Sequence, residues 1–106
     1  MAKGVMLVFS NPASADREDE YNRWYNGVHK DEFCAPDGVT GMTRYKLSEH
    51  QVPGVEGSSY KYLTIYEFKD VPTVLPTVLG LKTTRSDAVD PKANLVVFEP
   101  ILEYQK

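Results

Sequence analysis

Strand-like and helix-like apolar patterns follow one another along the chain in an order that strongly constrains the fold. A spacing of about two between apolar residues is typical of a strand, and a spacing of three to four is typical of a helix. These patterns predict helices over residues 15–33 and, short or kinked, over 71–84, with strands over residues 3–10, 39–47, 60–69 and 94–104. The order β-α-β-β-α-β predicts an α+β, ferredoxin-like fold with an antiparallel sheet, and residues 1–106 are expected to form one domain.

Prolines and loop residues refine this prediction. Pro72 suits the first turn of the second helix, whereas Pro76 removes a hydrogen bond deeper in it, so a short or kinked helix is expected there. Pro100 predicts an edge position, a bulge or a break in the last strand. Residues 48–59 are polar and contain glycine and proline, which predicts a long and mobile hairpin loop.

The predicted topology leaves one sheet face without cover. Both helices lie on one side, and we expect tyrosines and β-branched residues on the other side to form an exposed patch larger than monomers usually carry. A domain of this size also buries only about two thirds of the surface of its unfolded chain. The sequence therefore predicts a homodimer through this face.

Composition excludes several classes of partner. The net charge is -3 with both signs interspersed, so no basic face for nucleic acid is expected. No apolar run approaches the roughly 18 residues of a membrane span, and a cytoplasmic location is expected. Cys34 stands alone, and His29 and His50 have no metal-ligand spacing. Neither a metal site nor another cofactor is expected.

The most informative segment lies in the first predicted helix. Asn22, Tyr25, His29 and Phe33 fall on one narrow stripe at the edge of its apolar face. A histidine in this position is commonly a packing residue, but its polar neighbours favour a functional role. Imidazole, with an ordinary pKa of about 6.5, accepts and returns protons near neutrality.

Other side chains are candidates for a ligand pocket. Trp24 is expected in the core or the pocket wall. The strand tyrosines Tyr45 and Tyr66 could supply phenols, although alternating aromatics are first a packing surface. Arg44 is predicted in a central strand, where it either reaches solvent or pairs with an anion.

The run WYNGVH, followed by PDGVTGMTRYKL, resembles the dimeric α+β barrel superfamily, near its EthD-like branch. The resemblance implies a homodimer whose two sheets form a barrel, with a ligand cavity in each subunit between sheet and helices. The superfamily includes cofactor-free polyketide cyclases, muconolactone-type isomerases, quinone-forming monooxygenases, a plant hydroxynitrile lyase and haem-degrading enzymes. The fold alone does not choose among these activities.

These observations lead to one functional hypothesis and two alternatives. We expect a cofactor-independent lyase, cyclase or isomerase that moves protons on a small hydrophobic carbonyl or phenolic compound. His29 is expected as general base and Asn22 to orient the substrate, while Tyr25 or Tyr66 binds the developing enolate or alkoxide oxygen. The expected substrate-binding residues are Trp24, Phe33, Tyr45, Tyr66 and Arg44. The alternatives are a cofactor-free monooxygenase of an electron-rich aromatic and a non-catalytic small-molecule-binding protein.

Overall fold

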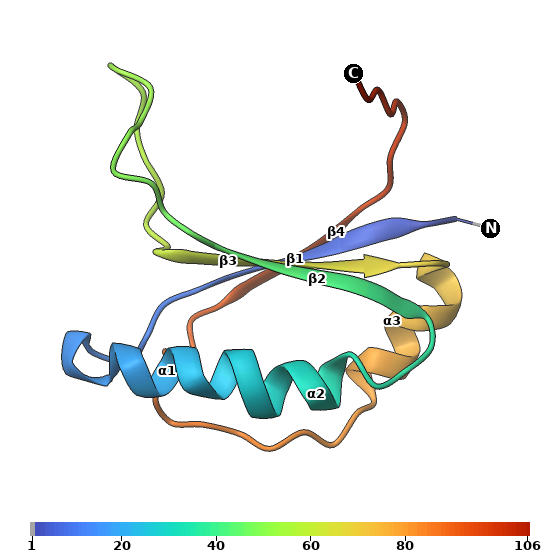
Figure 1. The fold of residues 1–106 in the computed structure, drawn as a ribbon, viewed down its shortest axis with the longest axis horizontal. Helices are drawn as coiled ribbons and strands as arrows, with labels where there is room; N and C mark the ends of the chain where they lie inside the picture. Colours follow the sequence, from blue (N-terminus) through green and yellow to red (C-terminus); the bar gives the residue numbers. More distant parts are fainter. Residues whose placement is uncertain (1) are drawn as a thin grey trace.

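The chain forms a four-stranded antiparallel sheet with its helices on one side. The computed structural model describes residues 2–106. The strands are β1 (Gly4–Ser10), β2 (Val39–Lys46), β3 (Tyr62–Phe68) and β4 (Asn94–Phe98), in the spatial order β2-β3-β1-β4. Figure 1 shows the helical layer below the sheet. This is the predicted ferredoxin-like α+β fold, except that β2 lies at an edge of the sheet and is not central as expected for the strand of Arg44.

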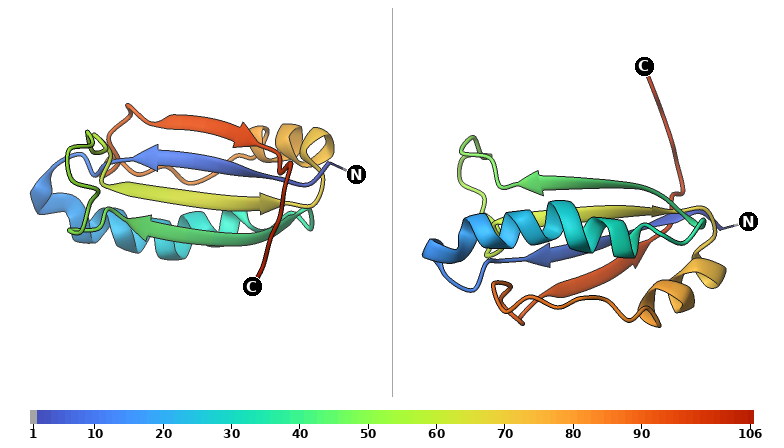
Figure 2. Two further views of the ribbon diagram at one scale, coloured as in Figure 1. Left: turned by 90° about the horizontal axis from the view of Figure 1, so that it is seen from above. Right: turned by 60° about the horizontal axis from the view of Figure 1, so that its bottom comes forward.

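The first helical segment runs without a break along the sheet, as predicted. It consists of a 3-10 turn η1 (Ala15–Arg17), α1 (Glu18–Trp24), a π-helical turn η2 (Tyr25–His29) and α2 (Lys30–Phe33). The second helix, α3 (Val71–Leu79), is short as predicted, with one proline in its first turn and Pro76 inside it. Beyond α3, the connection 80–93 returns past the first helical segment to β4 (Figures 1 and 2).

The helix-facing side of the sheet, called here the inner face, carries two groups of buried side chains. One group is mostly aliphatic and lies under α2 and α3: Met6, Val8, Phe33, Val39, Tyr66, Phe68, Val71, Val74 and Val78. The other is mostly aromatic and lies under α1 and η2: Tyr21, Tyr25, Tyr62 and Ala88. The aromatic group is where polar side chains enter the interior.

The opposite side of the sheet, called here the outer face, is covered by no helix and is mostly apolar. The registers between strands place these side chains together on it: Val5, Leu7, Phe9, Leu63, Ile65, Tyr45, Val96 and Phe98. The tyrosines expected in an exposed outer patch are there only in part, because Tyr62 and Tyr66 are buried on the inner face. The inner face is also the side on which Tyr66 was expected to reach a pocket. The hydroxyl groups of both tyrosines find hydrogen-bond partners on the helical segment, which an uncovered aliphatic face does not offer.

Two segments extend from the outer face. The β2–β3 loop and the C-terminal residues both rise on the side that has no helix (Figure 1). The last strand was predicted to reach residue 104, but β4 ends at Phe98, two residues before Pro100. A proline cannot donate to the ladder, so the strand stops there. The tail beyond it exposes Ile101, Leu102 and Tyr104 almost fully.

Within residues 2–106, no helix has the length and apolar character that crossing a membrane requires.

Candidate functional site

A π-helical turn sets the position of His29. The turn η2 (Tyr25–His29) widens the helix by one residue at the point where it faces β3. Gly27 lies in it, and a Cβ at that position would meet no atom within 4 Å. Gly27 therefore does not serve close packing, and it lies instead at a local irregularity of the helix. Such turns are frequent at functional sites.

His29 forms one hydrogen bond within an aromatic enclosure. Its Nε2 lies 2.9 Å from the hydroxyl oxygen of Tyr66 on β3. The imidazole stacks on Trp24 at 4.5 Å between ring centroids and meets the rings of Tyr25 and Phe33 at 5.1 and 5.3 Å. Its Nδ1 is buried and has no hydrogen-bond partner in residues 2–106. The imidazole is thus held through one nitrogen only.

Burial decides whether His29 and Tyr66 carry a proton at neutral pH. It lowers the pKa of His29 from 6.5 to about 4; the positive charge of Arg44 acts in the same direction and the carboxylate of Glu32 opposes it. Burial also raises the pKa of Tyr66 well above its usual range. At neutral pH the imidazole is uncharged and the phenol keeps its proton. The ordinary pKa assumed from the sequence does not hold for His29.

Arg44 occupies a second polar centre, nearer the start of the helical segment. Its Nη1 donates hydrogen bonds to the side-chain oxygens of Asn22 and Asn26, at 3.1 and 2.8 Å. Its guanidinium carbon lies 4.5 Å from the ring centre of Tyr25, and the rings of Tyr21 and Tyr62 are nearly as close, at 5.4 and 5.2 Å. Three phenol rings therefore surround one guanidinium.

Hydrogen bonds hold the rings of this centre in place. Asn22 donates from Nδ2 to the Tyr62 hydroxyl at 3.1 Å, and that hydroxyl donates to the carboxylate of Glu18. The hydroxyls of Ser10 and Tyr21 are 2.5 Å apart. Burial raises the pKa of Tyr21 to about 12 and also raises that of Tyr25. These phenols are therefore protonated at neutral pH.

The predicted stripe on the helix divides between the two centres. Asn22 contacts Arg44 and Tyr62, while Phe33 packs against His29 and against Tyr66, the latter at 4.3 Å between ring centroids. Tyr25 joins the centres, since its ring meets both His29 and Arg44.

The remaining predicted residues fall on both sides of the sheet. Trp24 forms part of the wall and donates from Nε1 to the carbonyl of Thr84 at 3.0 Å. Tyr45 lies on the outer face, exposed and away from both centres. Sequence reasoning did not single out Asn26 or Tyr21, although Asn26 follows Asn22 by one helical turn, which was the available signal.

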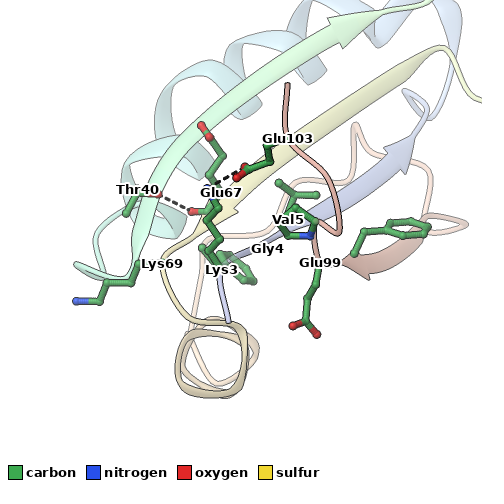
Figure 3. A pocket seen from close by; sticks show the side chains of 11 residues that line it. Lys3, Gly4, Val5, Thr40, Glu67, Lys69, Glu99 and Glu103 are labelled. Carbon is green, nitrogen blue, oxygen red and sulfur yellow. Dashed lines mark hydrogen bonds and ion pairs between the residues drawn. The ribbon is translucent and has the colours of Figure 1, made fainter. Parts of the chain in front are cut away.

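The hollows of the surface lie elsewhere. One of about 480 Å³ is on the outer face between the ends of β1, β3 and β4 and the tail. Figure 3 shows Lys3 paired with Glu103 beside it, at 2.8 Å, and Thr40 bonded to the backbone of Glu67. A second hollow of about 410 Å³ lies between α2 and β2, with Cys34 and Met42 among the residues that line it. Neither hollow is lined by His29, Tyr66 or Arg44, because aromatic rings fill the space between helix and sheet.

No metal centre is evident in the described part of the chain. Residues 2–106 contain no group of three or more histidine, cysteine, aspartate or glutamate side chains placed to hold an ion. Cys34 is half-buried with Met42 beside it at 3.9 Å between sulfurs, and burial raises the pKa of its thiol.

Comparison with known proteins supports the fold and goes no further. No family model matches the sequence, and no curated protein matches it. The structure is similar to the crystal structure of a DABB-family protein with a ferredoxin-like fold from Mesorhizobium loti, with a TM-score of 0.65 and 15% sequence identity. The match covers 95% of this chain and 99% of that one. At this identity the likeness shows the ferredoxin-like fold alone.

Proposed function

We propose that this protein is a cofactor-independent enzyme that transfers protons on a small hydrophobic carbonyl or phenolic compound, as a lyase, cyclase or isomerase. The observation that carries the proposal is the 2.9 Å hydrogen bond between His29 Nε2 and the Tyr66 hydroxyl, inside an aromatic enclosure. It joins an uncharged proton acceptor to a protonated donor at neutral pH.

His29 and Tyr66 have separate roles in the proposed enolisation. When substrate binds, the Tyr66 hydroxyl leaves His29 Nε2 and donates its hydrogen bond to the carbonyl oxygen, on which negative charge develops. The lone pair of Nε2 that this frees takes the proton that leaves the neighbouring carbon. A positioned base contributes typically 10²–10⁴-fold to the rate. The low pKa of His29 makes it a weak base. The hydrogen bond from Tyr66 to the substrate oxygen must therefore supply much of the stabilisation of the developing enolate.

A second copy of the chain completes the molecule in this proposal. The outer face is mostly apolar, and the exposed Ile101, Leu102 and Tyr104 extend from the same side. Surfaces of this kind on small domains are usually covered by a partner. We therefore propose a homodimer of the dimeric α+β barrel type, in its EthD-like branch, with one His29–Tyr66 centre in each subunit.

Hydrogen–deuterium exchange tests the proposed chemistry without knowledge of the final product. A panel of small ketones and β-diketones in deuterated buffer is followed by proton NMR with the wild-type chain, His29→Asn and Tyr66→Phe. The proposal requires faster loss of the protons beside the carbonyl with wild type than with either variant. Because His50 is exposed in the β2–β3 loop, His50→Asn serves as the matched control. Equal exchange rates with all four proteins contradict the proposal.

The second candidate is a non-catalytic protein that binds a hydrophobic metabolite. The filled space around His29 and its low pKa favour this alternative, since both reduce the capacity of the imidazole as a base. In this case a ligand raises the melting temperature of wild type and of His29→Asn, and neither protein accelerates exchange. Consumption of oxygen with an electron-rich phenol would instead indicate a cofactor-free monooxygenase.

A further inference from the structure

Arg44 carries a positive charge that no neighbouring carboxylate balances. None of the ion pairs within residues 2–106 includes it. Glu18, which binds the nearby Tyr62 hydroxyl, is already engaged with Lys61 at 2.8 Å. The partners of the guanidinium are two neutral amides and three ring faces. Ring faces attract a cation, but they do not neutralise it.

Several polar atoms between the helical segment and the inner face of the sheet lack hydrogen-bond partners. Arg44 Nε and Nη2, Thr64 Oγ1 and His29 Nδ1 are buried without a hydrogen bond to any atom of residues 2–106. Thr64 stands directly opposite Arg44 in the register of β3 with β2. Buried polar atoms are nearly always bonded in folded proteins, and an unbonded donor on a charged group is the most unfavourable case. The unpartnered donors of Arg44 and Thr64 therefore call for an acceptor that bears charge.

We propose that Arg44 is the anion-binding residue of this site and that the ligand carries a carboxylate on a small aromatic or aliphatic body. Two nitrogens of a guanidinium match the two oxygens of a carboxylate, and the Tyr21, Tyr25 and Tyr62 rings hold the guanidinium in a fixed plane. The Thr64 hydroxyl is a further donor on the same face. The inference rests on the proposed function only in identifying this ligand with the substrate.

The open edge of the sheet provides the approach. Strand β2 is an edge strand, Asn26 is exposed and Asn22 is half-buried. Both amides accept from the same nitrogen of Arg44. These amides occupy Nη1 only, so Nε and Nη2, which have no acceptor in residues 2–106, are left for the two oxygens of a carboxylate.

Calorimetric titration with matched pairs of carboxylates and amides tests the inference. Acetate, benzoate and phenylacetate are compared with acetamide, benzamide and phenylacetamide at pH 7 and constant ionic strength. We expect at least one carboxylate to bind about tenfold or more tightly than its amide, as for a charge-assisted pair. Arg44→Gln should remove this preference. Arg23→Gln, which changes an exposed arginine of α1, should keep it.

Asn26→Asp gives a second test that does not depend on the folding of Arg44→Gln. It places a carboxylate beside Nη1, where the amide oxygen now lies at 2.8 Å. The variant should raise the melting temperature of the free protein and weaken carboxylate binding by about tenfold, because the charge is then balanced internally. The inference is overturned if carboxylates bind wild type no better than amides do. It is also overturned if Arg44→Gln and Asn26→Asp bind carboxylates as tightly as wild type.

The outcomes also separate this inference from the proposed function. Carboxylate binding that depends on Arg44, in a protein without His29-dependent exchange, supports the anion site and contradicts the enzyme. Exchange that depends on His29, without a preference for carboxylates, supports the enzyme and contradicts the anion site.

Discussion

The two faces of one four-stranded sheet differ in what the chain itself provides to cover them. The inner face meets a helical segment of the same chain, and its tyrosines, His29 and Arg44 form hydrogen bonds and ring contacts there. The outer face carries aliphatic and aromatic side chains and is covered by no helix within residues 2–106. In this account the proposed catalytic residues lie on the inner face and the proposed dimer interface lies on the outer face. Substitutions on one face should therefore change activity or dimerisation, but not both.

A charge at the centre of the outer face should have the largest effect. Ile65 is paired with Leu7 in the middle of this face, and Ile65→Lys would bury an unpaired ammonium in the proposed interface. We expect the dissociation constant of the dimer to rise by about a hundredfold or more. Light scattering at micromolar concentration should give the mass of one chain.

The matched control for this variant is Leu79→Lys. It makes a similar change at an exposed apolar residue at the end of α3, away from the outer face. It should leave a mass of two chains. A wild-type protein that already scatters as a single chain would refute the proposed dimer.

The converse substitution lies on the inner face. His29→Asn keeps the approximate size and a hydrogen-bonding group but removes the base, so turnover should fall by about two orders of magnitude or more. The dimer mass should not change. Near-normal turnover in a folded His29→Asn dimer would mean that His29 is only a packing residue.

Acid should destabilise the protein through the inner face. The pKa of His29 is about 4 in the folded chain and about 6.5 when unfolded. Below pH 6.5 the unfolded chain therefore binds a proton that the folded chain does not, and stability falls as the pH falls. This contribution is absent above pH 6.5 and reaches its full size near pH 4.

Urea unfolding at several pH values measures this effect. Between pH 6.5 and 5, wild type should lose about 1–2 kcal/mol that His29→Asn does not lose. The carboxylates with lowered pKa values, Asp16, Glu18, Asp70 and Asp87, lose their contribution at lower pH, so this window isolates His29. Identical slopes for the two proteins would count against a buried neutral imidazole.

Removal of the exposed tail should weaken the dimer modestly. Truncation after Glu99 deletes Ile101, Leu102 and Tyr104, which contact little in their own chain. If these side chains reach the partner, the dissociation constant should rise by about tenfold, whereas deletion of Gln105 and Lys106 alone should have little effect. An unchanged constant in sedimentation would remove the tail from the interface.

The smallest effect concerns the β2–β3 loop. Residues 48–59 are all exposed and include Gly54 and Gly57. Their amides should exchange with solvent much faster than those of β3. Strong protection of the loop in the free protein would contradict its predicted mobility.

The fold was predictable because each element has a local signature. A continuous apolar run located β1, alternation located β2 and β3, and helical spacing located the segment from 15 to 33. The end of β4 was not predicted, because the strand was expected to reach residue 104 and Pro100 indicated an edge position, a bulge or a break. The side of the sheet that tyrosines occupy was not predictable, because alternation separates two faces without saying which one the helices cover. The inner position of Tyr62 and Tyr66 depends on the hydroxyl partners that the helix supplies.

The candidate site was predicted in part. The helical stripe brought Tyr25 and His29 together, but it did not show that Asn22 belongs with Arg44. This division depends on the π-helical turn and on the register of β2, both of which are tertiary features. The shifted pKa of His29 likewise follows from burial, which the sequence does not specify.

The pH titration of the His29 ring nitrogens by NMR tests the central claim most directly, namely that the inner face holds a neutral imidazole bound to Tyr66. The chain has two histidines, so His50→Asn leaves His29 as the one remaining signal. The account predicts a midpoint near pH 4, and it predicts that Tyr66→Phe changes the nitrogen shift of Nε2. A midpoint at or above pH 6.5, with shifts unaffected by Tyr66→Phe, would contradict it.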